Sequence, residues 1–487
     1  MSLSSAINAA QSSLSNIATQ TNNVSRNISN ASNPDYNRRN AALATSLNGA
    51  QVVSIQRAQD QVLFRQSIAG IATSSAQDSL LRGLSDLKSI FGGNDYENSP
   101  ATLIANMRDT LSTYAAKPGE ATLAQTAVAD ATTLANGLRE ASASVQRVRL
   151  DADQEIGIQV NSLNDLLSRF EVANKGVYAS TQAGKDVSAE LDERDGLLKQ
   201  ISSIIGVTPV TRSGNDVALY TASGTTLFET VARPVTFEPS AGFSASIQGN
   251  KVYVDGVPLA AGAGATTSAQ GSLQALIQVR DEVAPVVQAQ LDEIARALIV
   301  TFSEKDQSAI PVLPDEPGLF TWGGLTVPVG ATVVPGIAAT IAVNAALIPS
   351  QGGNPQLLRD GGINGAAYIS NSTGASGYSA ALDSYVLALD APTGFNAAAG
   401  ISVSDSITGF AADSIGWLEL NRSEANSAAV SREALRYRTE EALSNKTGVS
   451  LDEEMSMLLE LEQSYKASAR LISAVDEMLQ ELMAAVR

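Results

Sequence analysis

Two of the residue types that perform most protein chemistry are missing from this sequence. Its 487 residues include neither cysteine nor histidine. The chain therefore has no thiolate nucleophile, no disulfide, no imidazole base and none of the usual zinc ligands. A catalytic or metal site would have to be built from carboxylates, lysine, hydroxyls and backbone groups.

One short motif approaches the pattern of a phosphate-binding loop. Gly184-Lys185 matches the end of that pattern, but Ala179 stands where the first glycine belongs. Asp186 occupies the position at which Ser or Thr would hold magnesium. No phosphate site is predicted here.

A second motif begins like a calcium-binding loop. Asp151, Asp153 and Glu155 have the required alternation, but Ile156 replaces the glycine and Ser162 the bidentate glutamate. A solvated helix face is the expected interpretation.

A third cluster of charge runs from Glu190 to Asp195 and includes Asp192 and Arg194. Paired carboxylates can serve in acid–base catalysis, but no second cluster supports that role. We expect an exposed helix turn with local ion pairs. No catalytic, metal-binding or cofactor-binding residue is predicted, and the chain is not expected to be an enzyme.

Charge and hydropathy limit the partners. The net charge of -18 disfavours nucleic acid and anionic lipid surfaces. No window reaches the ~18 consecutive apolar residues of a membrane helix. Residues 3–28 carry no basic leader and are interrupted by Ser, Asn and Thr, so a cleaved secretory signal is not expected. If the protein leaves the cell, it uses another route.

The elements that remain to be explained are the two chain ends, because both carry a heptad repeat. At the N-terminus, apolar residues step by four and three over about 40 Å of predicted helix. This seam consists of Leu3, Ile7, Ala10, Leu14, Ile17, Val24 and Ile28, with Thr21 completing the row. Pro34 ends the helix.

The C-terminal repeat has the same period. One row is spaced by seven and an adjacent row completes the seam: Leu451, Leu458, Tyr465, Ile472, Leu479 and Val486, with Leu461, Val475 and Leu482. Ser450 and Glu453 form a capping box at its start.

The N-terminal helix is expected to be weak in isolation. Sixteen of residues 1–33 are Ser or Asn, which compete for backbone hydrogen bonds. A regular apolar stripe on so polar a helix indicates that a partner helix covers it. The stripe can be a seam within the chain, between chains or both, and so polar an N-terminal helix favours assembly with other chains.

Between the ends, helical periodicity alternates with two other segments. Residues 207–259 change to period two with glycine turns, which predicts an antiparallel β region, and residues 308–402 are rich in Pro and Gly. The predicted class is α+β, mostly α: a long helical bundle with terminal coiled-coil helices and inserted β-rich domains. The predicted divisions are a terminal helical domain (1–50 with 440–487), a rod-like helical domain (51–206 with 267–306 and 403–439), a β domain (207–266) and a loop-rich, partly β insertion (308–402).

Both ends resemble one known family. Residues 22–36 are similar to the N-terminal signature of the flagellar rod, hook and hook-associated proteins, with Asp35 in place of a glycine. Residues 448–478 look like the matching C-terminal signature, and residues 190–207 and 271–281 resemble segments typical of the hook-associated protein 1 branch. The signature positions carried over are Asn23, Asn27, Asn30, Pro34, Tyr36, Asp452 and Glu453.

The resemblance implies a structural subunit that is secreted through the flagellar export channel with a dedicated chaperone. It implies assembly at the hook–filament junction of the bacterial flagellum, with hook protein, the second junction protein and copies of itself as partners. The terminal seams are then the expected assembly interface. The alternatives are another axial protein, such as flagellin, hook protein or the second junction protein, and, less favoured, an extracellular adhesin or enzyme.

Overall fold

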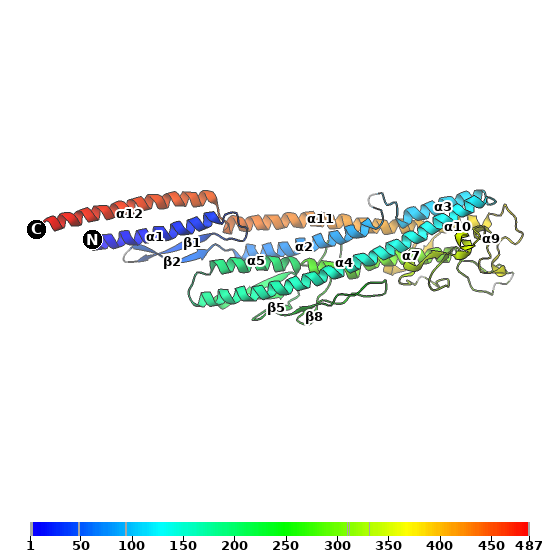
Figure 1. Ribbon diagram of the computed structural model, residues 1–487, viewed down its shortest axis with the longest axis horizontal. Coiled ribbons are helices and arrows are strands. Elements are labelled where there is room, and N and C mark those ends of the chain that lie inside the picture. The colour runs from blue at the N-terminus through cyan, green and yellow to red at the C-terminus, as the bar shows by residue number, and fades with distance from the viewer. Residues whose placement is uncertain are drawn as a thin grey trace.

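The computed structural model describes residues 3–46, 49–92, 95–308, 310, 312–330 and 332–485, which form one elongated molecule. Helices α1 (Leu3–Ser29) and α12 (Leu451–Ala485) lie side by side at one end, together with both chain ends (Figure 1). The other long helices run along the same axis and form the body. The chain passes between the two parts at residues 30–60 and after Thr447.

Local sequence marks where the helices of the body begin. Asp60 accepts hydrogen bonds from the N–H groups of Val62 and Leu63, and Ser99 caps a helix that opens with Pro100. The body helices are α2 (Gln61–Ser89), α3 (Pro100–Ala116), α4 (Ala121–Gln182), α5 (Ser188–Ile204), α6 (Ser272–Gln278), α7 (Ala284–Thr301) and α11 (Ile407–Thr447), with a π-helical turn at Val279–Val283 between α6 and α7.

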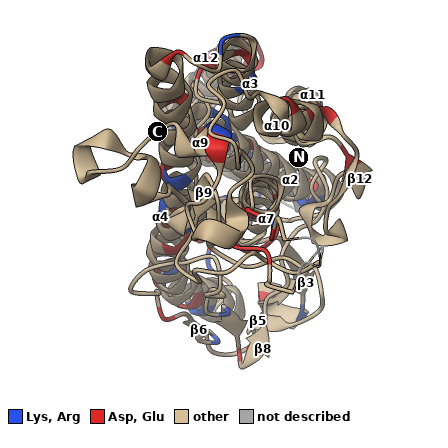
Figure 2. Cartoon of the chain, turned by 90° about the vertical axis from the view of Figure 1, so that its right-hand side faces the viewer, with Lys and Arg blue, Asp and Glu red and all other residues tan. Residues whose placement is uncertain are grey.

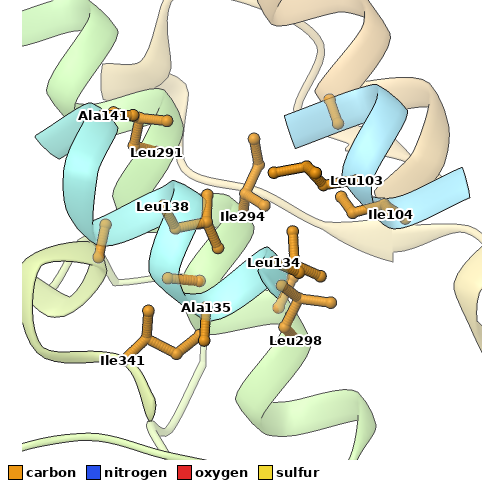
Figure 3. Packing of buried hydrophobic residues seen from close by; sticks show 14 of the residues in the cluster. Leu103, Ile104, Leu134, Ala135, Leu138, Ala141, Leu291, Ile294, Leu298 and Ile341 are labelled. Atoms are coloured by element: carbon orange, nitrogen blue, oxygen red, sulfur yellow. The ribbon is translucent and has the colours of Figure 1, made fainter. Parts of the chain in front are cut away.

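The core of the body is built around α4, whose 62 residues run for about 93 Å. Small buried residues such as Ala131 and Ala135 let the neighbouring helices approach closely. Figure 3 shows the apolar side chains that meet there from α3, α4, α7 and the segment at residue 341: Leu103, Ile104, Leu134, Leu138, Leu291, Ile294, Leu298 and Ile341.

A glycine marks one close contact in this core. Gly83 of α2 lies against Val279, and a Cβ at Gly83 would come within 2.5 Å of a Val279 methyl group. The π-helical turn therefore packs directly on the backbone of α2. Pro285 follows in the first turn of α7, where a helix tolerates proline because its missing N–H has no partner within the helix.

Two small antiparallel sheets follow α5, within the residues where alternation predicts strands. Their orders are β3-β4-β5 and β6-β7-β8, and they lie on the side of the body away from α11 and α12 (Figures 1 and 2). The strands are β3 (Val207–Thr211), β4 (Val217–Thr221), β5 (Thr226–Phe228), β6 (Val235–Thr236), β7 (Tyr253–Val254) and β8 (Val257–Pro258).

A buried ion pair holds the loop after β6 to the helices and corrects one prediction. Asp153 is not on a solvated face: it is fully buried, and its carboxylate accepts from Arg280 at 2.5 Å and from the N–H of Ser240 at 2.6 Å. The side chain of Arg280 is itself only 1% exposed. Asp153 is therefore a structural anchor for the β region.

The far end of the body consists of short elements tied to α7. Two adjacent buried carboxylates form these ties, because Asp292 accepts from the N–H groups of Gly336 and Ala338, and Glu293 accepts from that of Asn396. The elements are β9 (Phe320–Thr321), α8 (Ile337–Thr340), β10 (Ala342–Val343), α9 (Leu357–Asp360), α10 (Ala380–Asp390), β11 (Thr393–Gly394) and β12 (Ser404–Asp405), with 3-10 turns at Ala345–Leu347, Pro349–Gln351, Ala366–Tyr368 and Ala397–Ala399. A further 3-10 turn, Ser213–Asn215, lies between β3 and β4.

A hairpin between the terminal helix and the body was not anticipated. Strands β1 (Arg39–Ser46) and β2 (Gly49–Arg57) pair antiparallel from Arg39 with Arg57 to Ser46 with Gly49. The hairpin packs against α1. The predicted class of α+β with a predominance of helix is confirmed.

Candidate assembly interface

Helices α1 and α12 pack against each other along part of the seams that the heptad repeats predict. Ile17 and Val24 of α1 meet Leu461 of α12 in a buried cluster, and Ala10 and Val475 are buried further along the pair. The seam also contains polar contacts, since the hydroxyls of Ser13 and Ser468 lie 3.0 Å apart. The described core of this part is small.

The other predicted seam residues differ in how far they are buried. Ile7, Leu14, Ile28, Leu458, Ile472 and Leu479 are half-buried. Leu451, Tyr465 and Leu482 are 52%, 55% and 60% exposed in the single chain. The side chain of Leu3 and the whole of Val486 lie outside the described residues. Whether these residues contact other copies stays a prediction.

At its body end, the helix pair is closed by a buried polar network centred on Asn27. The Asn27 amide donates to the backbone carbonyl of Arg39 at 3.0 Å and to the carboxylate of Glu454 at 3.1 Å. Its side-chain oxygen accepts from the Tyr36 hydroxyl at 2.8 Å and from the N–H of Arg39 at 3.1 Å. Asn23 adds a donor to the same carbonyl at 2.8 Å. The signature residues Asn23, Asn27 and Tyr36 therefore fold the chain back onto α1.

Glu454 carries the charge in this network. It is 3% exposed and lies one turn inside α12, where it accepts from Asn27 and pairs with Arg38 at 3.1 Å. Arg38 also bridges to the neighbouring Glu453, which is largely exposed. Burial of the Tyr36 ring raises the pKa of its hydroxyl, which therefore stays a hydrogen-bond donor to Asn27.

Arg38 and Arg39 are adjacent but hold different parts of the molecule. Consecutive side chains of an extended segment point to opposite sides. Accordingly, Arg38 reaches Glu453 and Glu454 on α12, while Arg39 reaches Asp192 on α5 at 3.4 Å. This dipeptide therefore joins the terminal helix pair to the body.

Asp192 is the acceptor on the body side, which makes the prediction of an exposed, locally paired cluster wrong. It is 8% exposed and accepts from Asn37 at 2.9 Å and from Arg57 at 3.0 Å. Asp195 takes the other branch of Arg57 at 2.6 Å. These partners are remote in sequence, so the carboxylates anchor both strands of the β1–β2 hairpin to α5.

The remaining signature positions shape the turns at the same place. Asn30 donates to the carbonyl of Arg26 at 2.9 Å and so satisfies an end of α1. Pro34 lies exposed in the loop that follows, next to Asp35, which pairs with Lys199 of α5 at 2.8 Å. Asp452 is exposed in the first turn of α12.

The capping box at the start of α12 is formed in one direction. The N–H of Glu453 donates to the Ser450 hydroxyl at 3.4 Å. The carboxylate of Glu453 instead faces Arg38. The acidic first turn also suits the positive end of the helix dipole.

The residues that sequence reasoning missed are Arg38, Arg39, Arg57 and Glu454. Glu454 had a signal, because it stands in the same sevenfold row as Leu461, Ser468 and Val475, where an acid is out of place unless it is paired. The arginines gave none, because their partners are far away along the chain.

A groove of about 930 Å³ lies beside this network. The loop at residues 31–37, the start of α2, strand β3 and the end of α11 line it, with Phe64, Leu198 and Tyr437 among its apolar side chains. Within the described residues, no group of three or more acidic side chains is placed to hold a metal ion. None of the described helices is long and apolar enough to cross a membrane.

Two family models match the chain. Residues 84–315 match the flagellar hook-associated protein FlgK helical domain, and residues 442–485 match the flagellar basal body rod FlgEFG protein C-terminal region. The second match includes all of α12 with its acidic start.

Individual proteins are also similar. Flagellar hook-associated protein 1 of Bacillus subtilis (strain 168) is 23% identical over 98% of this chain and 96% of its own length. The proteins of the same name from Salmonella typhimurium and Escherichia coli K12 are 24% and 25% identical over 49% and 52% of this chain, and over 45% and 48% of their own lengths.

A solved structure is similar over about half of the chain. It is the flagellar hook junction protein FlgK from Burkholderia pseudomallei, with 20% identity, a TM-score of 0.43, and coverage of 53% of this chain and 47% of that one. The matches to the family models and to the curated relatives agree with the terminal signatures. The chain belongs to the flagellar hook-associated protein 1 family.

Proposed function

We propose that this protein is a structural subunit of the bacterial flagellum that joins hook to filament by self-assembly through α1 and α12. Family membership supports the flagellar, structural role. The observation that supports assembly through the ends is the surface of α12. Large apolar residues along this helix remain exposed after α1 has covered its seam.

The contrast with the body strengthens this assignment. The two large apolar clusters of the body draw on residues 76–425 and 156–277 and are filled by the chain itself. The terminal pair has a separate small cluster. A helix that exposes large apolar side chains on more than one flank is stable in water only when neighbours cover them. Equivalent helices of other subunits are the natural cover.

The partners follow from this role. Copies of the same chain form the tube, hook protein adjoins it on one side and the second junction protein on the other, and a chaperone protects the ends before export. A head-to-tail interface of this kind builds helical arrays rather than closed dimers. The protein then acts outside the cell, at the hook–filament junction, and has no catalytic role.

Removal of the terminal pair tests the proposal. A chain of residues 59–447 keeps both large clusters and should fold as a monomer. Expressed in cells that lack the protein, it should leave hooks bare and release filament subunits into the medium. Immuno-electron microscopy should not find it on hooks.

A matched control keeps both ends and changes an exposed apolar residue of the far end. Leu325→Ser replaces a side chain that is 72% exposed and remote from α1 and α12. It should restore filaments fully. If the truncated chain still joined hook and filament, the proposed role of the terminal helices would be wrong.

A further inference from the structure

Six of the nine large apolar residues exposed on α12 form two separate patches. The proximal patch, near the body, consists of Leu451, Met455 and Leu459, which are 52%, 48% and 57% exposed. The distal patch consists of Leu471, Met478 and Leu482, which are 59%, 51% and 60% exposed. Each patch spans about two to three helical turns. Contiguous exposed apolar surface of this kind marks a contact with another macromolecule.

The two patches lie on opposite flanks of the helix. At 100° per residue their centres are about 160° apart around the axis, and Met455 and Met478 are about 35 Å apart along it. The seam that faces α1, marked by Glu454, Leu461, Ser468 and Val475, runs between them. Met457, 41% exposed, is on the distal patch's side but is separated from that patch by Glu460 and Ser464.

Each flank is polar or small where the other is apolar. On the proximal patch's flank, the distal half of α12 carries Ala469, Ser473 and Gln480. On the distal patch's flank, the proximal half carries Glu453 and Glu460. A straight side-by-side contact between two copies would place apolar side chains against these polar ones. A shift along the axis brings apolar surface against apolar surface.

Helix α1 does not supply the missing cover. Its outward residues, such as Asn8, Gln11 and Ser15, are polar and exposed. Two patches on opposite flanks also do not suit a two-fold contact, in which a single patch meets itself. They suit a heterologous contact in which each copy offers one patch to each of two neighbours.

We infer that the distal patch of one copy packs on the proximal patch of the next, so that neighbouring α12 helices are staggered by about 35 Å. This inference rests on the proposed function and specifies its contact. In the assembled junction, the copies at one end then have an uncovered proximal patch and the copies at the other end an uncovered distal patch. The junction therefore offers a different apolar patch to the structure on each of its two sides.

The absence of cysteine makes the contact directly testable. Met455→Cys and Met478→Cys each introduce a single thiol into a chain that has none. The two variants are expressed together in cells that lack the native protein, and isolated flagella are oxidised with copper phenanthroline. Non-reducing electrophoresis should show a covalent dimer from the mixture and none from either variant alone.

A second mixture provides the matched control. Ser473→Cys lies near the distal patch in sequence but on the opposite flank of α12, and its side chain is exposed. Mixed with Met455→Cys it should give no dimer. Filament formation and recovery of each variant in flagella show that assembly has occurred.

Each result has one meaning. Dimers from Met478→Cys alone, or from the control mixture, would overturn the stagger. Assembled flagella without any dimer would also overturn it, because another protein would then cover the patches. Failure of the unaltered chain to enter flagella would instead contradict the proposed function.

Discussion

The terminal pair and the body use long helices in opposite ways. Helix α4 contributes buried side chains along nearly all of its 62 residues, and its neighbours come from the same chain. Helix α12 has 35 residues, of which four are buried: Glu454, Leu461, Ser468 and Val475. The body is therefore stabilised within one subunit, whereas the stability of the terminal pair depends on contacts that a single subunit does not make.

The largest expected effect tests the body. Phe170 is fully buried and packs edge-on against Phe228 with ring centroids 5.2 Å apart. Phe170→Ala should lower the free energy of unfolding by about 3–5 kcal/mol, because it removes a large apolar side chain and leaves a cavity. Urea unfolding of the full chain measures this. A change below about 1 kcal/mol would contradict the view that this core is closed and tightly packed.

The next effect concerns the connection between the two regions. Asp192→Asn removes the buried charge that Arg39 and Arg57 share and should cost about 3 kcal/mol in unfolding free energy. Asp165→Asn removes an exposed partner of Arg169 and should change stability by less than about 0.5 kcal/mol. Limited proteolysis should cut the first variant faster between residues 30 and 60. Equal rates would mean that this carboxylate does not hold the hairpin.

A pH effect is expected from the body alone. Burial, with a smaller contribution from Glu293, raises the pKa of Asp292 to about 6 from 3.8. The folded state binds the proton more tightly, so this contribution to stability is full below about pH 4 and is lost as the pH rises through 6. The loss should approach about 3 kcal/mol.

The variant Asp292→Asn isolates this contribution. Urea unfolding from pH 4 to 7 should show a smaller decline for the variant than for the native chain, since other titrating groups are common to both. Identical pH profiles would contradict the raised pKa. A chain without α1 and α12 should behave like the full chain in this experiment.

The sequence predicted the terminal helix pair better than it predicted the connection between this pair and the body. The seam between α1 and α12 could be predicted because apolar residues that repeat every seven positions on a polar helix indicate packing against another helix. The β1–β2 hairpin was not predicted, because Arg39–Ser46 has three alanines among its eight residues and lacks the alternation of a half-buried strand. The pairing of Asp192 with Arg39 and Arg57 joins residues 153 and 135 positions apart, which local pattern cannot reveal.

The smallest effect on the free subunit is expected in the terminal seam. Ile17→Ala removes part of a small cluster at the edge of the molecule, and the pair can adjust or open locally. The unfolding of the body should change by no more than about 0.5 kcal/mol. Filament formation should nevertheless fall sharply, and motility assays measure this. If Ile17→Ala left motility normal but destabilised the body, the terminal seam would serve the stability of the subunit rather than its assembly.

Hydrogen exchange of α1 tests the central claim most directly. Backbone amides of α1 should exchange much faster than those of α4 in the free subunit, and should become strongly protected in isolated flagella. Ordering of α1 by neighbouring copies predicts this difference. If α1 were as protected as α4 in the free subunit, the terminal pair would be stable by itself and the account would be wrong.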